Sequence, residues 1–146
     1  MKYEWDKKRS AMRLDRRLHT ATVFPADYGF IADTKSADDE ALDVLVLTEE
    51  PAFPGCWVRA RPIGVFWIAY PEEGDEAREP KVLAVPLDDP DWAEVNDISD
   101  LPQHRREEIS HFFDVYKDLE PSRSPSPQGF DSRAAAWSVI ESARSD

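Results

Sequence analysis

The hydrophobic pattern of this chain changes its period about two thirds of the way along, and this change restricts the folds that it can adopt. In the first part, apolar residues alternate with polar ones or form short runs rich in β-branched and aromatic side chains, as in β-strands. The predicted strands cover residues 2–6, 18–24, 42–47, 57–70 and 81–87. In the last part, apolar residues recur at helical spacing. Strands followed by helices predict an α+β domain with a mainly antiparallel sheet or barrel.

Two amphipathic helices are predicted in the last third of the chain. The apolar face of the first, within residues 101–120, consists of Ile109, Phe112, Phe113 and Tyr116. Pro102 suits its first turn, and Asp100 lies where a capping residue is expected. The apolar face of the second consists of Ala136, Val139, Ile140 and Ala143. The segments that interrupt the pattern are a charged loop at residues 71–80 and a Pro/Ser linker at residues 121–129, before the C-terminal helix.

The composition predicts one folded domain that spans residues 1–146. A length of 146 residues is usual for a single domain, and a hydrophobic content of 41% exceeds that of disordered acidic chains. The net charge of -12 opposes binding to nucleic acid, and no apolar run is long enough for a signal peptide or a membrane span. We therefore expect a cytoplasmic protein with neither nucleic-acid nor membrane partners. Cys56 is the single cysteine, which excludes an intramolecular disulfide, and we expect it in the core.

An acidic cluster precedes the apolar run 44–47 and consists of Asp38, Asp39, Glu40 and Asp43. Carboxylates this close together repel one another, so a cation is expected beside them. Carboxylates without a neighbouring histidine or cysteine favour Mg²⁺ or Mn²⁺. A calcium-binding EF-hand loop is excluded because it would need glycine where Asp43 stands. Taken alone, such a short motif is more often a solvated acidic turn.

Further motifs surround this cluster in a fixed order. They are K-Y-E at 2–4, L-D-R at 14–16, F-P-A-D-Y-G-F-I at 24–31, R-P-I-G-V at 61–65, K-V-L-A-V-P at 81–86 and H-F-F-D-V-Y-K-D-L-E at 111–120. Together with D-D-E-A-L-D-V-L-V at 38–46, they resemble the soluble family I inorganic pyrophosphatases. The resemblance implies a five-stranded OB-like β-barrel with helices packed on it. It also implies Mg²⁺-dependent hydrolysis of pyrophosphate to two phosphates, with water activated at the metal centre.

The resemblance further implies roles for individual residues. Asp38, Asp43 and Glu79 correspond to metal ligands, and Glu40 corresponds to the base that acts on the attacking water. The residues that would hold phosphate groups or complete the pocket are Lys2, Glu4, Arg16, Tyr28, Lys81, Tyr116 and Lys117. We expect Arg16 and Lys81 to be exposed charges in a cleft. Because bacterial members commonly form hexamers, a homo-oligomer is also expected.

Several positions depart from the family pattern. Glu40 and Glu79 replace aspartates, Ala41 replaces a proline, Phe24 replaces a tyrosine, and Tyr70 stands where the family has a metal-binding aspartate. The candidate replacements for that ligand are Glu72, Glu73, Asp75 and Glu76. The chain starts at the K-Y-E motif, so we expect a divergent, N-terminally short member.

These departures leave two functions open: a pyrophosphatase of reduced efficiency, or an impaired relative that serves as an anion-binding or assembly module. A generic acidic interaction domain with no site is disfavoured. It would have no reason to retain lysine, arginine and tyrosine at so many of the matched positions.

Overall fold

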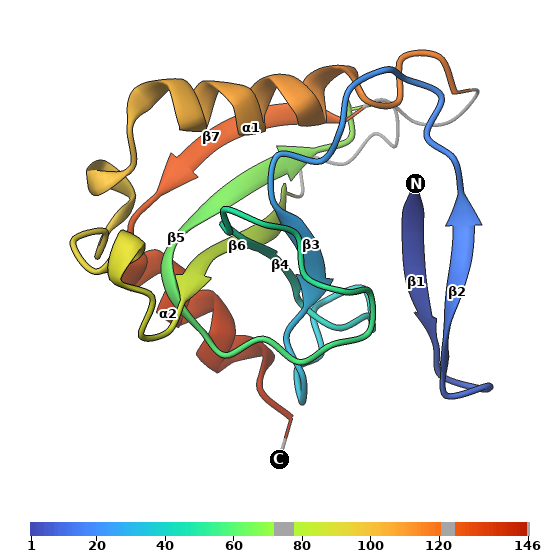
Figure 1. The fold of residues 1–146 in the computed structure, drawn as a ribbon, viewed down its shortest axis with the longest axis horizontal. Helices are drawn as coiled ribbons and strands as arrows, with labels where there is room; N and C mark the ends of the chain where they lie inside the picture. The colour runs from blue at the N-terminus through green and yellow to red at the C-terminus, as the bar shows by residue number, and fades with distance from the viewer. Residues whose placement is uncertain (72–77, 121–124, 146) are drawn as a thin grey trace.

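The strands of the computed structural model form a two-stranded hairpin and a five-stranded sheet (Figure 1). The structure describes residues 1–71, 78–120 and 125–145. The hairpin pairs β1 (Lys2–Asp6) with β2 (Ala11–Arg16). The sheet contains, from edge to edge, β3 (Asp27–Phe30), β4 (Asp43–Val46), β6 (Arg78–Pro86), β5 (Ala60–Ala69) and β7 (Ser126–Asp131). Short 3-10 helices η2 (Pro90–Trp92) and η3 (Ile98–Asp100) precede α1 (Gln103–Val115), and α2 (Arg133–Ala143) follows β7.

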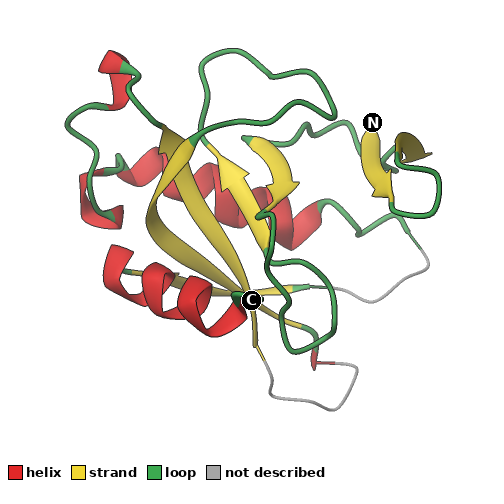
Figure 2. Cartoon of the chain, turned by 90° about the horizontal axis from the view of Figure 1, so that it is seen from below, coloured by secondary structure: helices red, strands yellow, loops and turns green. Residues whose placement is uncertain are grey.

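The three central strands of the sheet, β4, β6 and β5, are buried on both faces. Along β4, Val44 and Val46 belong to a core cluster with Ile140 of α2, whereas Leu45 belongs to the cluster that contains Phe113 of α1. Successive side chains of a strand point to opposite faces, so a strand covered on both sides is apolar throughout. Figure 2 shows α1 and α2 on different sides of the curved strands. This burial explains the uninterrupted apolar runs in β4 and β6.

The sheet is antiparallel except for the parallel pair β4–β6. This arrangement confirms the predicted α+β class, with an OB-like five-stranded architecture and helices packed on it. Among the described residues, no helix is long and apolar enough to cross a membrane.

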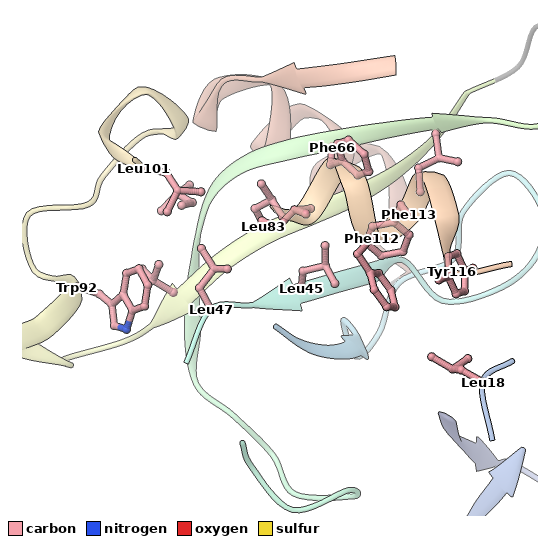
Figure 3. Packing of buried hydrophobic residues seen from close by; sticks show 14 of the residues in the cluster. Leu18, Leu45, Leu47, Phe66, Leu83, Trp92, Leu101, Phe112, Phe113 and Tyr116 are labelled. Carbon is pink, nitrogen blue, oxygen red and sulfur yellow. The ribbon is translucent and has the colours of Figure 1, made fainter. Parts of the chain in front are cut away.

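Aromatic side chains of α1 fill the interior on one side of the sheet (Figure 3). The ring of Phe113 lies 5.7 Å from that of Phe66 on β5, and Phe112 stacks on Tyr116 at 5.0 Å, measured between ring centroids. Ile109 completes the buried face of the helix. The predicted apolar face is therefore confirmed, and Tyr116 is held at the margin of the core.

The prediction of a strand at residues 18–24 is wrong. Strands form instead at β2 and β3, and residues 18–24 are a loop in which Leu18 inserts into the core and Phe24 packs against it. The hydroxyl of Thr20 accepts a hydrogen bond from the Thr22 backbone N–H at 3.2 Å. Such local bonds compete with strand pairing, which explains why a threonine-rich stretch with apolar residues does not extend the sheet.

Three smaller expectations also fail. Asp100 does not cap α1, which begins after Pro102; its carboxylate instead accepts hydrogen bonds from the N–H groups of Asn96 and Asp97 around η3. The second half of the predicted linker forms β7, an edge strand, where proline is tolerated. Residues 121–124 and 72–77 of the predicted linker and loop lie outside the described residues. Cys56 is exposed rather than part of the core.

Replacing Gly64 with alanine is expected to destabilise the fold by about 1–3 kcal/mol, the usual cost of overpacking. A Cβ atom there would lie 2.8 Å from the backbone oxygen of Asp131 and 2.9 Å from Cβ of Ile98. Urea unfolding measures the change. Gly29→Ala is the matched control, because a Cβ on Gly29 meets nothing within 4 Å, and it should not lower stability. Equal stability of the two variants would contradict the tight contact at Gly64.

Candidate functional site

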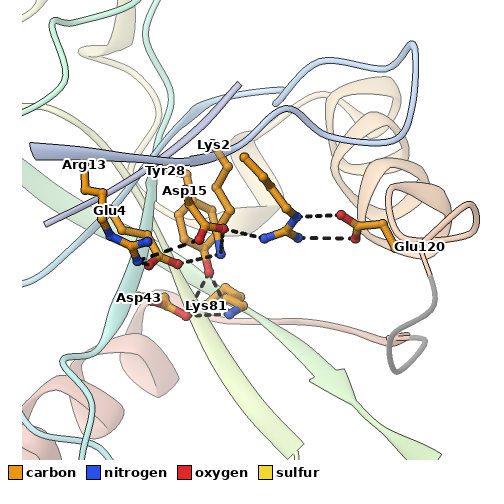
Figure 4. Close-up of polar contacts among 9 residues, drawn as sticks. Lys2, Glu4, Arg13, Asp15, Tyr28, Asp43, Lys81 and Glu120 are labelled. Atoms are coloured by element: carbon orange, nitrogen blue, oxygen red, sulfur yellow. Dashed lines mark hydrogen bonds and ion pairs between the residues drawn. The ribbon is translucent and has the colours of Figure 1, made fainter. Parts of the chain in front are cut away.

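The centre of the candidate site is a contact among Tyr28, Asp43 and Lys81 (Figure 4). These residues lie on the adjacent strands β3, β4 and β6, so the strand order brings them together. The Lys81 ammonium donates to the Tyr28 hydroxyl at 2.8 Å, and that hydroxyl donates to Oδ2 of Asp43 at 2.9 Å. Lys81 Nζ also contacts Oδ2 of Asp43 directly. The carboxylate therefore receives two hydrogen bonds on one oxygen.

Burial and charge together fix the protonation of this contact. Lys81 is only 5% exposed. Burial disfavours its charged form, but the Asp43 carboxylate outweighs burial and raises the pKa of Lys81. Burial of the hydroxyl and the same carboxylate raise the pKa of Tyr28, so its phenol keeps its proton at neutral pH. The expectation of an exposed Lys81 is therefore wrong, and Lys81 supplies the cation that the local sequence lacks beside Asp43.

The polar side chains of the hairpin form a second network, which Figure 4 draws together with this contact. Lys2 donates to Glu4 at 2.9 Å, and Arg13 donates to the other oxygen of Glu4 at 2.8 Å. Asp15 lies 3.7 Å from both Lys2 and Arg13. The register of the hairpin, which pairs Glu4 with Arg13, places these charges on one face. The opposite face exposes apolar side chains to solvent: Tyr3, Trp5, Met12 and Leu14.

Arg16 joins the hairpin to the segment that follows α1. Its Nε donates to Oε1 of Glu120 at 2.6 Å and its Nη2 donates to Oε2 at 3.2 Å, while Nη1 donates to Asp15 at 2.6 Å. The side chain of Arg16 is 30% exposed and that of Glu120 is 5% exposed. The expectation of an exposed Arg16 therefore holds only in part, because the bidentate pair half-buries it.

Aromatic rings line the site next to α1. Phe24 lies 5.5 Å from Tyr28 and 6.5 Å from Tyr116, measured between ring centroids. Burial raises the pKa of Tyr116 to about 12. Lys117 Nζ lies 5.5 Å above the ring of Tyr116 and 5.9 Å above that of Tyr70, which is 6% exposed. Tyr116 and Lys117 therefore lie close to Tyr70, which stands where the family pattern has a metal-binding aspartate.

The acidic turn before β4 is ordered by its own hydrogen bonds. The Ser36 hydroxyl donates to Oδ1 of Asp38 at 2.6 Å, and the Glu40 backbone N–H donates to the same oxygen at 3.1 Å. The hydrogen bond from the Ser36 hydroxyl makes the largest contribution to lowering the pKa of Asp38, and the bond from the Glu40 N–H lowers it further. Asp39 adopts a left-handed conformation with φ of 67°, which an aspartate in a tight turn tolerates. Asp38 and Glu40 remain exposed at the surface of this turn.

The carboxylates that the resemblance assigns as metal ligands have the donor atoms that a metal ion such as Mg²⁺ requires. Asp38, Asp43 and Glu79 offer the oxygen donors that Mg²⁺ and Mn²⁺ prefer. Glu79 lies two residues before Lys81 on β6, and its charge adds to the raised pKa of Lys81. Within the described residues, no three carboxylate, histidine or cysteine side chains are grouped closely enough to hold an ion. The further candidate ligands at residues 72–76 lie outside the described part of the chain.

Three residues of this polar network had no predicted role: Arg13, Asp15 and Glu120. Asp15 and Glu120 lie within the L-D-R and Y-K-D-L-E motifs, so the motifs themselves held the signal. Arg13 could have been found from the two-residue alternation with Asp15 once a strand at 11–16 was recognised.

The buried Lys81 ammonium and the Tyr28 hydroxyl, together with the lysine and arginine side chains of the hairpin, are fixed donors of the kind that stabilise negative charge on phosphate oxygens. A family model described as inorganic pyrophosphatase matches residues 1–146. The chain belongs to the inorganic pyrophosphatase family.

Individual relatives agree with this assignment. The chain is 43% identical to the inorganic pyrophosphatase of Leifsonia xyli over 140 residues, which cover 96% of this chain and 83% of the relative. It is 44% identical to that of Streptomyces coelicolor over the same shares. The solved structure of the Helicobacter pylori inorganic pyrophosphatase superposes with a TM-score of 0.91 at 38% identity, covering 97% of this chain and 82% of the other. That from Thermus thermophilus gives 0.91 at 34% identity, covering 97% and 80%.

Proposed function

We propose that this protein hydrolyses inorganic pyrophosphate to two phosphates with Mg²⁺, or Mn²⁺ in its place. The observation that carries the proposal is the contact of Tyr28 and Asp43 with the buried ammonium of Lys81. Fixed N–H and O–H donors in a partly desolvated site stabilise charge that develops on phosphate oxygens more strongly than water does. The family assignment supports pyrophosphate as the substrate.

In this proposal, the basic and phenolic groups hold the substrate. They are Lys2, Arg16, Lys81, Lys117, Tyr28 and Tyr116. Glu4 orients Lys2 through their 2.9 Å ion pair. Glu40 takes a proton from the water that attacks one phosphorus atom, while the bond from that phosphorus to the bridging oxygen breaks. When bound to Asp38, Asp43 and Glu79, Mg²⁺ would supply charge that offsets the pyrophosphate anion and acidifies water.

A second candidate function is an anion-binding or assembly module with impaired turnover. The observation that favours it is Tyr70, buried beneath Lys117 at the position where the family pattern has a metal-binding aspartate. A phenol there cannot replace a carboxylate as a ligand at neutral pH without losing its proton. The basic and tyrosine side chains could then bind phosphate without efficient hydrolysis.

The setting of the protein is also a proposal. The resemblance to bacterial pyrophosphatases favours a homo-oligomer, a hexamer by analogy, in the cytoplasm. The net charge of -12 argues against a nucleic-acid partner, and we propose no membrane partner.

Phosphate release from pyrophosphate tests the function directly. We expect release that requires added Mg²⁺ or Mn²⁺ and stops when EDTA is added. Calorimetric titration with inorganic phosphate serves as the companion measurement. Binding of phosphate without release from pyrophosphate under any of these metals would favour the impaired module instead, and neither binding nor release would refute both functions.

A further inference from the structure

The hairpin carries Lys2 and Arg16, which the proposed function assigns to substrate binding, although it pairs with no strand of the five-stranded sheet in the described part of the chain. Its apolar face is about half exposed, with relative exposures of 36% for Met12 and 51% for Leu14. The Met12 side chain lies against Gly55, and neither residue belongs to the buried core, so hydrophobic packing anchors that face only weakly. Isolated two-stranded hairpins are marginally stable. Other contacts must therefore set the orientation of β1 and β2.

The bidentate pair between Arg16 and Glu120 is such a contact. It joins the end of β2 to the segment after α1 across 104 residues of sequence. Leu18, two residues after Arg16, packs in the same core as Tyr116, four residues before Glu120. The core therefore fixes the chain next to each partner of the ion pair. Bidentate arginine–carboxylate pairs fix the orientation of the guanidinium plane as well as its position.

This pair leaves part of the guanidinium available. Arginine has five N–H groups, and the contacts to Glu120 and Asp15 use one each on Nε, Nη1 and Nη2. Two N–H groups have no acceptor among the described residues. They lie on the terminal nitrogens of a group whose plane is held by a buried carboxylate, which suits them to bind a phosphate oxygen.

We infer that Glu120 is a positioning residue: it orients Arg16, and with it the hairpin, for binding of a pyrophosphate phosphoryl group. The inference rests on the proposed function and adds a role for a residue outside the assigned site. Glu120 acts through Arg16 and does not touch the substrate.

The charge of Glu120 is essential to this role. The hydrogen bond from Arg16 lowers the pKa of Glu120, so the carboxylate is ionised at neutral pH. Glutamine has nearly the same shape but only one acceptor oxygen, and its NH₂ group would face an N–H donor of Arg16. Glu120→Gln therefore breaks the bidentate pair with little change in volume, whereas Glu120→Asp keeps the charge.

Steady-state kinetics of the full chain test the inference. We expect Glu120→Gln to raise KM for pyrophosphate about tenfold with a smaller change in kcat, because a contact made equally in the ground and transition states affects binding. Calorimetry should show a comparable loss of affinity for inorganic phosphate. Glu120→Asp should recover most of both. Glu141→Gln, which removes the exposed pair with Arg144 at 3.3 Å, is the matched control and should change neither.

A double-mutant cycle separates positioning from general stability. If Glu120 acts through Arg16, adding Glu120→Gln to an Arg16→Lys variant should cost little further affinity. The inference is overturned if folded Glu120→Gln keeps parental KM and phosphate affinity, or if its loss is equally large in the Arg16→Lys background. If Glu120→Gln does not fold, the same cycle with Glu120→Met, which also removes the carboxylate, decides. If the parent protein does not hydrolyse pyrophosphate but Glu120→Gln still weakens its binding of phosphate, the proposed function is rejected and the inference about Glu120 stands.

Discussion

Replacing Lys81 with methionine is expected to lower kcat/KM for pyrophosphate by about 100-fold or more, the usual loss when a preorganised donor to a developing anion is removed. Methionine keeps an unbranched apolar side chain in a position that is 5% exposed, but it carries no charge. Asp43 then loses its buried cation, and the Tyr28 hydroxyl loses its donor. Phosphate release measured over a range of pyrophosphate concentrations gives the change in kcat/KM.

Two further variants show whether the loss comes from the charge or from packing. Lys81→Ala should lose a similar amount of activity and also melt at a lower temperature than Lys81→Met, because it leaves a cavity between buried neighbours. Lys35→Ala is the matched control: it removes an ion pair of 3.3 Å with Asp39, but both side chains are well exposed, so neither activity nor melting should change. A Lys81→Met variant with parental activity would give Lys81 a structural role alone.

The elements that the sequence predicts well are those whose pattern reflects local geometry. The face formed by Ile109, Phe112 and Phe113 is buried as expected, because helical spacing alone places these side chains on one side. The short apolar runs in β4 and β6 are strands because both of their faces are covered. The prediction for residues 18–24 fails for the opposite reason. Their composition suits a strand, but no strand among the described residues pairs with them, and a local Thr20–Thr22 bond forms instead.

The site could be predicted only in part. Ordered motifs identify Tyr28, Asp43 and Lys81 as members of one site, yet spacing cannot show that Lys81 neutralises Asp43 from 38 residues away. That contact depends on the parallel pairing of β4 with β6. The role of Arg16 is similar, because its partner Glu120 follows a different element. Long-range ion pairs depend on the packing of elements, which no local pattern contains.

The turn that carries Glu40 is well defined in its backbone. The Glu40 carbonyl accepts hydrogen bonds from the Ser36 N–H at 2.8 Å and from the Ser36 hydroxyl at 2.9 Å. In the part of the chain that the structure describes, the Ala41 N–H donates no hydrogen bond, so proline at this position removes none. Proline would also restrict Glu40 to an extended conformation and narrow the range of directions in which its side chain can point.

Glu40→Gln is expected to lower kcat by about 100-fold or more if Glu40 is the base, because an amide cannot accept the proton from water. The double change Glu40→Asp with Ala41→Pro should act in the opposite direction and raise kcat. It shortens the side chain to the aspartate of the family pattern and stiffens the turn, and a misplacement of about 1 Å can cost about 100-fold in rate. Phosphate release from saturating pyrophosphate with Mg²⁺ compares the three proteins.

Comparing the double change with Tyr70→Asp also identifies which feature limits kcat in the parent protein. If Tyr70 limits turnover instead of the turn, the double change does nothing by itself, and Tyr70→Asp should raise kcat because it restores a carboxylate beside Lys117. If the turn limits turnover, the double change succeeds without Tyr70→Asp. Parental kcat in Glu40→Gln would remove Glu40 from the mechanism altogether. The proton would then go to another carboxylate of the acidic turn. Asp38 is poorly suited to this role, because two hydrogen bonds to its Oδ1 lower its pKa and make it a weaker base.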